Sequence, residues 1–239
     1  MGRLANFLGV TLSRWISARG LEPVPEPEPN PAAALFERPG LKFLHVGCGA
    51  ARKPEVASCF LSDDWREIRL DIDKNAEPDV VCSMLDMTEV PDASVDALYS
   101  SHNIEHLYPH QVAVALDEFY RVLKPEGFLL LGCPDLQAVC KLVAEDKLME
   151  TAYVSDSGPI APLDIIYGHR PHMAAGNLFM AHHTGFSLRS LVEAARSAGF
   201  RSVAGRQRTQ FLDLWIAASK SLLSEDETAS RLVSYLPSQ

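Results

Sequence analysis

The sequence predicts an α/β domain in which a mostly parallel sheet carries helices on both faces. From residue 41 onward, short apolar runs that suit buried strands alternate with segments of helical periodicity. The first of these runs, Leu41–Val46, ends at Gly47-Cys48-Gly49, where glycines let a strand turn sharply into the next segment. Strands that alternate with helices pair in parallel, because each helix returns the chain to the same edge of the sheet.

The expected elements follow from these two patterns. Strand signals occur at Leu41–Val46, Glu67–Ile72, Val80–Cys82, Val95–Ser100, Phe128–Leu131, Ser202–Ala204 and Phe211–Ser219. Helical periodicity occurs at Gln111–Leu123, Leu136–Leu148 and Leu188–Ala198. The run Lys124-Pro125-Glu126-Gly127 is expected to end the first helix and turn into the next strand.

Composition limits the function classes. With 47% apolar and 22% charged residues, the 239-residue chain has enough apolar material for a sizeable core. A formal net charge of −9 argues against general affinity for nucleic acid, because phosphate binding needs an excess of Lys and Arg. The five cysteines have no metal-ligand spacing, and no stretch suits a membrane span or signal peptide. We therefore expect reduced thiols and a cytoplasmic protein.

Four segments lie outside the regular alternation or interrupt it. Residues 1–20 have apolar residues at helical spacing among arginines, which predicts an amphipathic helix; residues 21–40 are a stiff Pro-rich linker. Such a helix suits peripheral contact with a membrane, or docking on its own domain or on a second subunit as a dimer. The main domain is expected at residues 41–219, followed by a tail at 220–239. Within it, residues 151–186 fit neither period, as is typical of a substrate lid or insertion.

A glycine run and a later carboxylate predict a ligand site at the carboxyl edge of the sheet. Gly47 and Gly49 let the backbone approach a ligand closely. Asp71 ends the next strand, 22 residues after Gly49, about where an acidic side chain binds a ribose hydroxyl pair. A dinucleotide site would need a third glycine where Arg52 stands, which makes a nicotinamide-dependent oxidoreductase the weaker alternative.

Five blocks in this order resemble the class I S-adenosylmethionine-dependent methyltransferases, notably the small-molecule branch similar to ubiquinone-biosynthesis methyltransferases. The blocks are Leu44–Gly49, the strand end at Asp71, Ser83–Met87, Ser101–Leu107 and Phe119–Gly127. The resemblance covers about residues 41–219. It implies a Rossmann-like, doubly wound, mostly parallel seven-stranded sheet with helices on both faces and an antiparallel last strand. It also implies S-adenosyl-L-methionine as cofactor.

The resemblance further implies which residues contact the methionine part of the cofactor. Gly47 and Gly49 would face it, within the run that includes His45 and Cys48. Family members often have an acidic residue where this chain has His45, so the sequence departs from the pattern there. Ser101 would lie near the sulfonium.

The nucleoside part has its own implied contacts. Asp71 would bind the ribose hydroxyls, with Ile72 beside the adenine. Asp86 would accept a hydrogen bond from the adenine amino group, while the backbone of Met87 meets the ring.

Histidines are the candidates for the chemistry. Methyl transfer from a sulfonium needs alignment of the acceptor and removal of its proton, and His102 and His106 follow the fourth strand. The spacing of His102, Glu105 and His106 also suits a metal site. No metal is expected, since in the resembled family the Glu-His pair opens a helix and sets local geometry. The candidate substrate-binding residues are His102, Tyr167, His169, His182 and His183.

The expected function is methyl transfer from S-adenosylmethionine to a small-molecule, glycan or lipid-intermediate acceptor. No nucleic-acid acceptor is expected, because the net charge is negative and no Asn-Pro-Pro-aromatic run follows the fourth strand. A different class remains as an alternative: a catalytically silent partner that keeps the cofactor fold for assembly or membrane recruitment.

Overall fold

The computed structural model describes residues 32–53 and 56–237. The predicted helix at residues 1–20, and the linker up to residue 31, lie outside the described residues. Among the helices of the described part, none is both long enough and apolar enough to cross a membrane.

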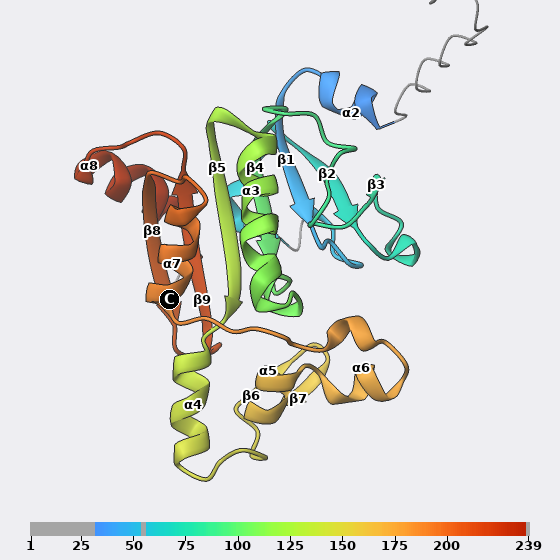
Figure 1. The fold of residues 1–239 in the computed structure, drawn as a ribbon, viewed down its shortest axis with the longest axis vertical. Helices are drawn as coiled ribbons and strands as arrows, with labels where there is room; N and C mark the ends of the chain where they lie inside the picture. The colour runs from blue at the N-terminus through green and yellow to red at the C-terminus, as the bar shows by residue number, and fades with distance from the viewer. Residues whose placement is uncertain (1–31, 54–55, 238–239) are drawn as a thin grey trace, which may run out of the picture. The chain divides into compact units, whose positions relative to one another are not determined.

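A seven-stranded sheet with the order β3-β2-β1-β4-β5-β9-β8 organises the described chain (Figure 1). Its strands are β1 (Leu41–Val46), β2 (Trp65–Asp71), β3 (Val80–Val81), β4 (Val95–Ser101), β5 (Leu123–Pro134), β8 (Ser202–Arg208) and β9 (Asp213–Ser219). Strands β1 to β5 pair in parallel, and β9 runs antiparallel to both of its neighbours. The predicted fold class, with its antiparallel last strand, is confirmed.

Helices cover both faces of this sheet because successive strand residues point to opposite sides. On one face, α3 (Val112–Val122) and α7 (Leu188–Ser197) share a core with Leu44 and Val46 of β1. On the other face, Phe43 of β1 packs in a cluster that includes Phe60 and Leu232. Phe60 ends the short helix η2 (Ser58–Phe60). Short α2 (Ala33–Glu37) precedes β1 and adds Phe36 to the first core.

Residues 220–237, which the sequence suggested as a tail, pack against the sheet. They form α8 (Glu225–Glu227), the π-helix η7 (Thr228–Leu232) and α9 (Val233–Tyr235). Leu232 is fully buried, and the ring of Tyr235 stacks on that of Phe128 with centroids 4.0 Å apart. These apolar contacts hold the segment in the fold.

Residues 151–186, called the insertion from here on, contain short elements. They are β6 (Tyr153–Ser155), β7 (Gly158–Ile160), α5 (Pro162–Tyr167), α6 (Arg170–Ala174) and the 3-10 helix η6 (Leu178–Met180). The insertion follows α4 (Leu136–Ala144) and lies beyond the carboxyl ends of the parallel strands (Figure 1). No long helix or strand forms there, in keeping with the lack of a clear period in its sequence.

The expected turn after α3 is replaced by a bulged strand. Val95 pairs with Leu123 and Ala97 pairs with Phe128, so the register shifts between these pairs. Lys124 lies in the bulge and donates from Nζ to Asp96 Oδ1 at 2.7 Å. The proline and glycine that suggested a turn therefore accommodate the bulge, while the chain continues in β5.

Candidate active site

A cavity of about 750 Å³ lies at the carboxyl ends of β1, β2 and β4. The strand order reverses between β1 and β4, and ligands of open α/β sheets bind at such a switch point. Asp71 and Ile72 line the cavity beside β2, while Ser101 and His102 line it beside β4. The volume suits a cofactor together with a small second ligand.

The two glycines after β1 shape the wall in different ways. Gly47 has a φ of +66°, and a Cβ there would come within 2.2 Å of the Asn103 side chain. Gly49 has a φ of +49°, and a Cβ there would meet nothing within 4 Å. Gly47 therefore permits close packing inside the protein, whereas Gly49 borders open space in the cavity.

Asn103, which the sequence analysis did not single out, ties the ends of β1 and β4 together. Its Nδ2 donates to the carbonyl oxygens of Val46 at 3.1 Å and Ser101 at 2.9 Å. Asn103 also lines the cavity. It could not be recognised from the sequence, because Gly47 is remote from it in the chain.

Asp71 fixes the position of the loop after β1, which carries Gly47 and Gly49. Its Oδ2 accepts a hydrogen bond from Gly49 N at 2.7 Å, and its Oδ1 accepts one from Asp73 N at 2.8 Å. A carboxylate can accept about four hydrogen bonds, so lone pairs remain for a ligand's hydroxyls. The predicted contact with ribose agrees with this placement and stays a prediction.

Arg69 is a second positioning residue that the sequence analysis missed. Its guanidinium donates to the carbonyl oxygens of Gly49 at 2.5 Å, Ala51 at 3.3 Å, Ala76 at 3.1 Å and Glu77 at 2.6 Å. Arg69 is buried, and it joins the loop after β1 to the loop after β2. It therefore braces both loops that carry the expected cofactor contacts.

Asp86 and Met87, the residues expected to contact the adenine, lie outside the lining of the main cavity, and their contact with the cofactor stays a prediction. Ser83 and Met84 line the cavity, whereas Asp86 and Met87 do not. The Met87 amide already donates to Glu118 Oε2 at 2.7 Å, and the Met87 side chain is fully buried. Asp86 is exposed. The anchoring of this loop to α3 is the physical reason that residues nearer β3 face the cavity.

His45 and Cys48 also lie outside the cavity lining. His45 points to the opposite face of the sheet from Val46, and its Nδ1 lies 2.7 Å from Glu67 Oε1. The His45 ring meets Tyr99 edge-on. Cys48 is buried, and desolvation raises its pKa to about 11. Alternation along β1 thus removes His45 from the expected cofactor contacts.

His102 lies where the main cavity meets a side cavity of about 170 Å³ under the insertion, and it lines both. Its φ of +55° is unusual for a residue with a side chain. Its amide donates to Gly132 O at 2.9 Å, and its Nδ1 lies 3.0 Å from Ser101 Oγ. Although His102 is exposed as a whole residue, desolvation of its ring lowers its pKa, which favours the neutral imidazole.

The other candidate histidines separate into two groups. His183 lines the main cavity and stacks on Tyr108 with centroids 4.2 Å apart. His169 and His182 line the side cavity, and His106 lines both. Tyr167 lines neither cavity and is 61% exposed, so the structure does not bring it to the site.

Comparison with known proteins finds one family that resembles part of this chain. The methyltransferase domain family model matches residues 44–131. A search of curated proteins gives no match in sequence.

Two solved structures share the fold. The citrinin polyketide synthase CMeT domain aligns with a TM-score of 0.50 and 13% identity over 76% of this chain and 47% of that chain. This chain thus spans about half the length of that relative. The PH0226 protein from Pyrococcus horikoshii OT3 aligns with a TM-score of 0.50 and 15% identity, over 77% and 84% of the two chains. At these identities the likeness establishes the fold.

The family match runs from β1 through most of β5, the strands whose ends build the main cavity. Residues 44–131 therefore resemble a methyltransferase domain in sequence, and the described chain shares the fold of the two solved structures.

Proposed function

We propose that the protein transfers the methyl group of S-adenosylmethionine to a nucleophilic oxygen or nitrogen of a small molecule held beside the end of β4. The supporting observation is that His102, His183 and Phe179 line the same cavity as Gly47 and Gly49. Imidazoles beside apolar side chains suit a compact, partly apolar acceptor with one polar group. The reactive end of a glycan or lipid intermediate has the same requirements.

The strand order supports an arrangement with the cofactor's ribose near β2 and the methyl acceptor near β4. Asp71 lies at the end of β2, on one side of the glycine loop, and His102 lies after β4 on the other side. With the ribose at Asp71, the sulfonium would lie near the ends of β1 and β4. The remaining space faces His102, and an in-line displacement needs the acceptor on that side.

His102 is the proposed proton acceptor. Its lowered pKa keeps the imidazole neutral near pH 7, as a general base requires. The contact with Ser101 engages Nδ1 and leaves Nε2 for the acceptor's proton. His106, the other predicted base, has Nδ1 at 3.1 Å from Ala181 O.

The net charge of −9 supports a proposal without a nucleic-acid acceptor. Contact with a membrane or a second subunit through residues 1–20 belongs to the proposal as well, and those residues lie outside the described chain.

The experiment uses the full chain and tritiated S-adenosylmethionine with separate pools of small metabolites, lipids, glycans and RNA. Transfer of label to the small metabolites, the lipids or the glycans supports the proposal, and transfer of label to RNA overturns it.

Once the acceptor is known, the His102→Ala substitution should lower the rate of methyl transfer about 10²–10⁴-fold. The variant should still bind S-adenosylhomocysteine. His110→Ala is the matched control, because His110 is exposed and lines neither cavity. Equal activity of the two variants would rule out His102 as the base.

A further inference from the structure

Glu105 is a buried carboxylate without partners. It lies in the 3-10 helix η4 (Ile104–His106), is 1% exposed, and neither Oε1 nor Oε2 has a hydrogen-bond partner within the described part of the chain. Across the described residues, no Lys or Arg forms an ion pair with it. Desolvation raises its pKa to about 8. A carboxylate in this position needs either a proton or a cation, since burial of an unpaired charge is costly.

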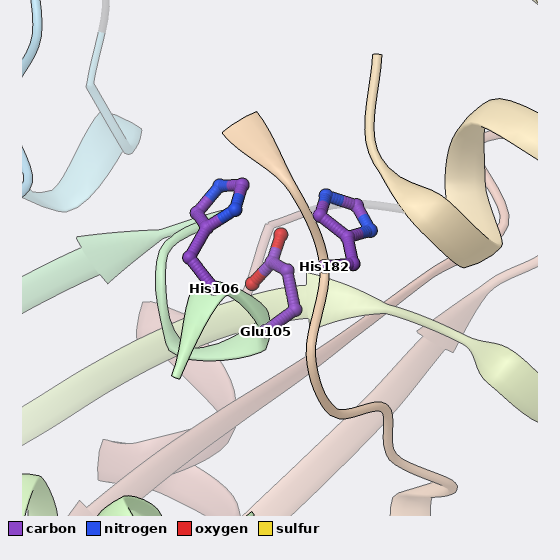
Figure 2. A group of neighbouring side chains, drawn as sticks. All are labelled: Glu105, His106 and His182. Atoms are coloured by element: carbon purple, nitrogen blue, oxygen red, sulfur yellow. The ribbon is translucent and has the colours of Figure 1, made fainter. Parts of the chain in front are cut away.

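Two histidines flank this carboxylate. Figure 2 shows the Glu105 carboxylate between the rings of His106, from the same short helix, and His182, from the insertion. The ring centroids of the two histidines are 4.8 Å apart. One carboxylate oxygen and one nitrogen from each ring all lie within 4.8 Å of one another.

Backbone carbonyls orient both rings in the way that metal ligands require. Nδ1 of His106 donates to Ala181 O at 3.1 Å, and Nδ1 of His182 donates to Ile165 O at 2.7 Å. With the proton held on Nδ1, the lone pair is on Nε2. Histidine ligands of metal ions are typically held in this manner through their second ring nitrogen.

We propose that Glu105, His106 and His182 bind one divalent transition metal ion of the zinc class. Two imidazoles and one carboxylate form a common ligand set for Zn²⁺ and for Fe²⁺, Co²⁺ or Mn²⁺. Ligand atoms about 2.0–2.2 Å from one ion stand roughly 3.0–3.5 Å apart, so the ion would draw the three side chains closer together. The buried Glu105 oxygens would then gain the partner that the described chain does not provide.

Between them, the three proposed ligands line both cavities, so an open coordination position of the ion would be accessible to the methyl acceptor. Glu105 lines the side cavity, while His106 lines both cavities, next to His102. An acceptor oxygen bound to the ion there would lose its proton more readily. This role rests on the proposed function, whereas ion binding does not.

The proposal departs from the expectation of no metal. The spacing of Glu105 and His106 alone favoured a structural role. His182 completes the ligand set, and only the fold of the insertion brings it to Glu105.

The test begins with ion binding by the full chain after treatment with a chelator. Zn²⁺ is titrated by calorimetry, and Co²⁺ by its visible absorption, which reports nitrogen and oxygen ligation. The expected result is one ion per chain. Glu105→Gln and His182→Ala should each weaken binding by more than the roughly 10–100-fold that loss of an outer partner costs. His183→Ala is the matched control, because this neighbouring histidine stacks on Tyr108 outside the cluster and should bind the ion like the wild type.

S-adenosylhomocysteine affinity and the melting temperature verify that each variant is folded. Glu105→Gln keeps the shape of the side chain, and the wild-type titration needs no variant. Failure of the folded wild type to bind one ion, or equal binding by Glu105→Gln and the wild type, would overturn the site. Ion binding without methyl transfer to any pool would leave the site standing and reject the proposed function. Methyl transfer that proceeds undiminished in chelator would reject the ion's part in catalysis.

Discussion

The Asp71 carboxylate accepts a hydrogen bond from the backbone amide of Gly49 at 2.7 Å, although 22 residues separate the two. This bond joins the loop after β1 to the end of β2 at the edge of the main cavity. The two signals that predicted a cofactor site from the sequence are therefore parts of one structure. Loss of either should disturb the same ligand.

Replacement of Asp71 by alanine should weaken S-adenosylhomocysteine binding about 100-fold or more. The substitution removes the brace on Gly49 and the expected acceptor of the ribose hydroxyls, and hydrogen bonds to a charged group contribute about 1.5–3 kcal/mol each. Calorimetry measures the affinity, and circular dichroism verifies the fold. Asp63→Ala is the control, because Asp63 is exposed and lies away from the cavity lining. Unchanged affinity in Asp71→Ala would refute the assigned role.

Arg69→Met should lower affinity for S-adenosylhomocysteine by about 10–100-fold and lower the melting temperature. Four backbone carbonyls of the two cavity loops would lose a charged donor, and each such bond contributes about 1.5–3 kcal/mol. Calorimetry and thermal unfolding provide the two readouts. Arg66→Met, an exposed position on the same strand, should behave like the wild type. If both variants bind equally well, Arg69 does not position the loops.

Gly47→Ala should destabilise the protein more than Gly49→Ala. Both positions have positive φ, which costs a residue with a Cβ about 1–2 kcal/mol. At Gly47 the new Cβ would also overlap the Asn103 side chain. Denaturant unfolding measures the free energy of unfolding of each variant. A Gly47→Ala/Asn103→Ala double variant should show positive coupling, because the second change removes the overlap. Strictly additive effects would argue that strain at φ, rather than packing on Asn103, accounts for Gly47.

Asp164 should make the stability of the insertion depend on pH. Arg170 donates to both of its carboxylate oxygens and holds the pKa of Asp164 at about 2, below its usual value. The lowered pKa means that the pair stabilises the folded state fully above about pH 4 and loses this contribution as pH falls toward 2. Asp164→Asn should therefore cost about 1–2 kcal/mol near pH 7 and little at pH 2.

Urea unfolding of both proteins across this pH range measures the difference. Asp156→Asn, an exposed acidic position in the same insertion, is the control and should match the wild type throughout. A difference for Asp164→Asn that stays constant from pH 7 to pH 2 would contradict the ion pair as its source.

Several of the sequence predictions concern features that neighbouring residues specify together. The apolar run of β1 and the glycines after it predicted a strand with the observed bounds, Leu41–Val46, and a sharp turn. Asp135 is the N-cap of α4, and its Oδ1 accepts a hydrogen bond from Ala138 N at 3.2 Å. Burial period, turn residues and caps are local properties, and they carry over directly from the sequence.

The sequence by itself thus predicted the fold class and the position of Gly47, Gly49 and Asp71 at one edge of the sheet. Tertiary structure decided which neighbours of these residues line the cavity. His45 is turned away by the alternation of β1, and Met87 by its hydrogen bond to Glu118. Only folding brings His182 to Glu105, because a contact between distant segments depends on packing that no local pattern encodes.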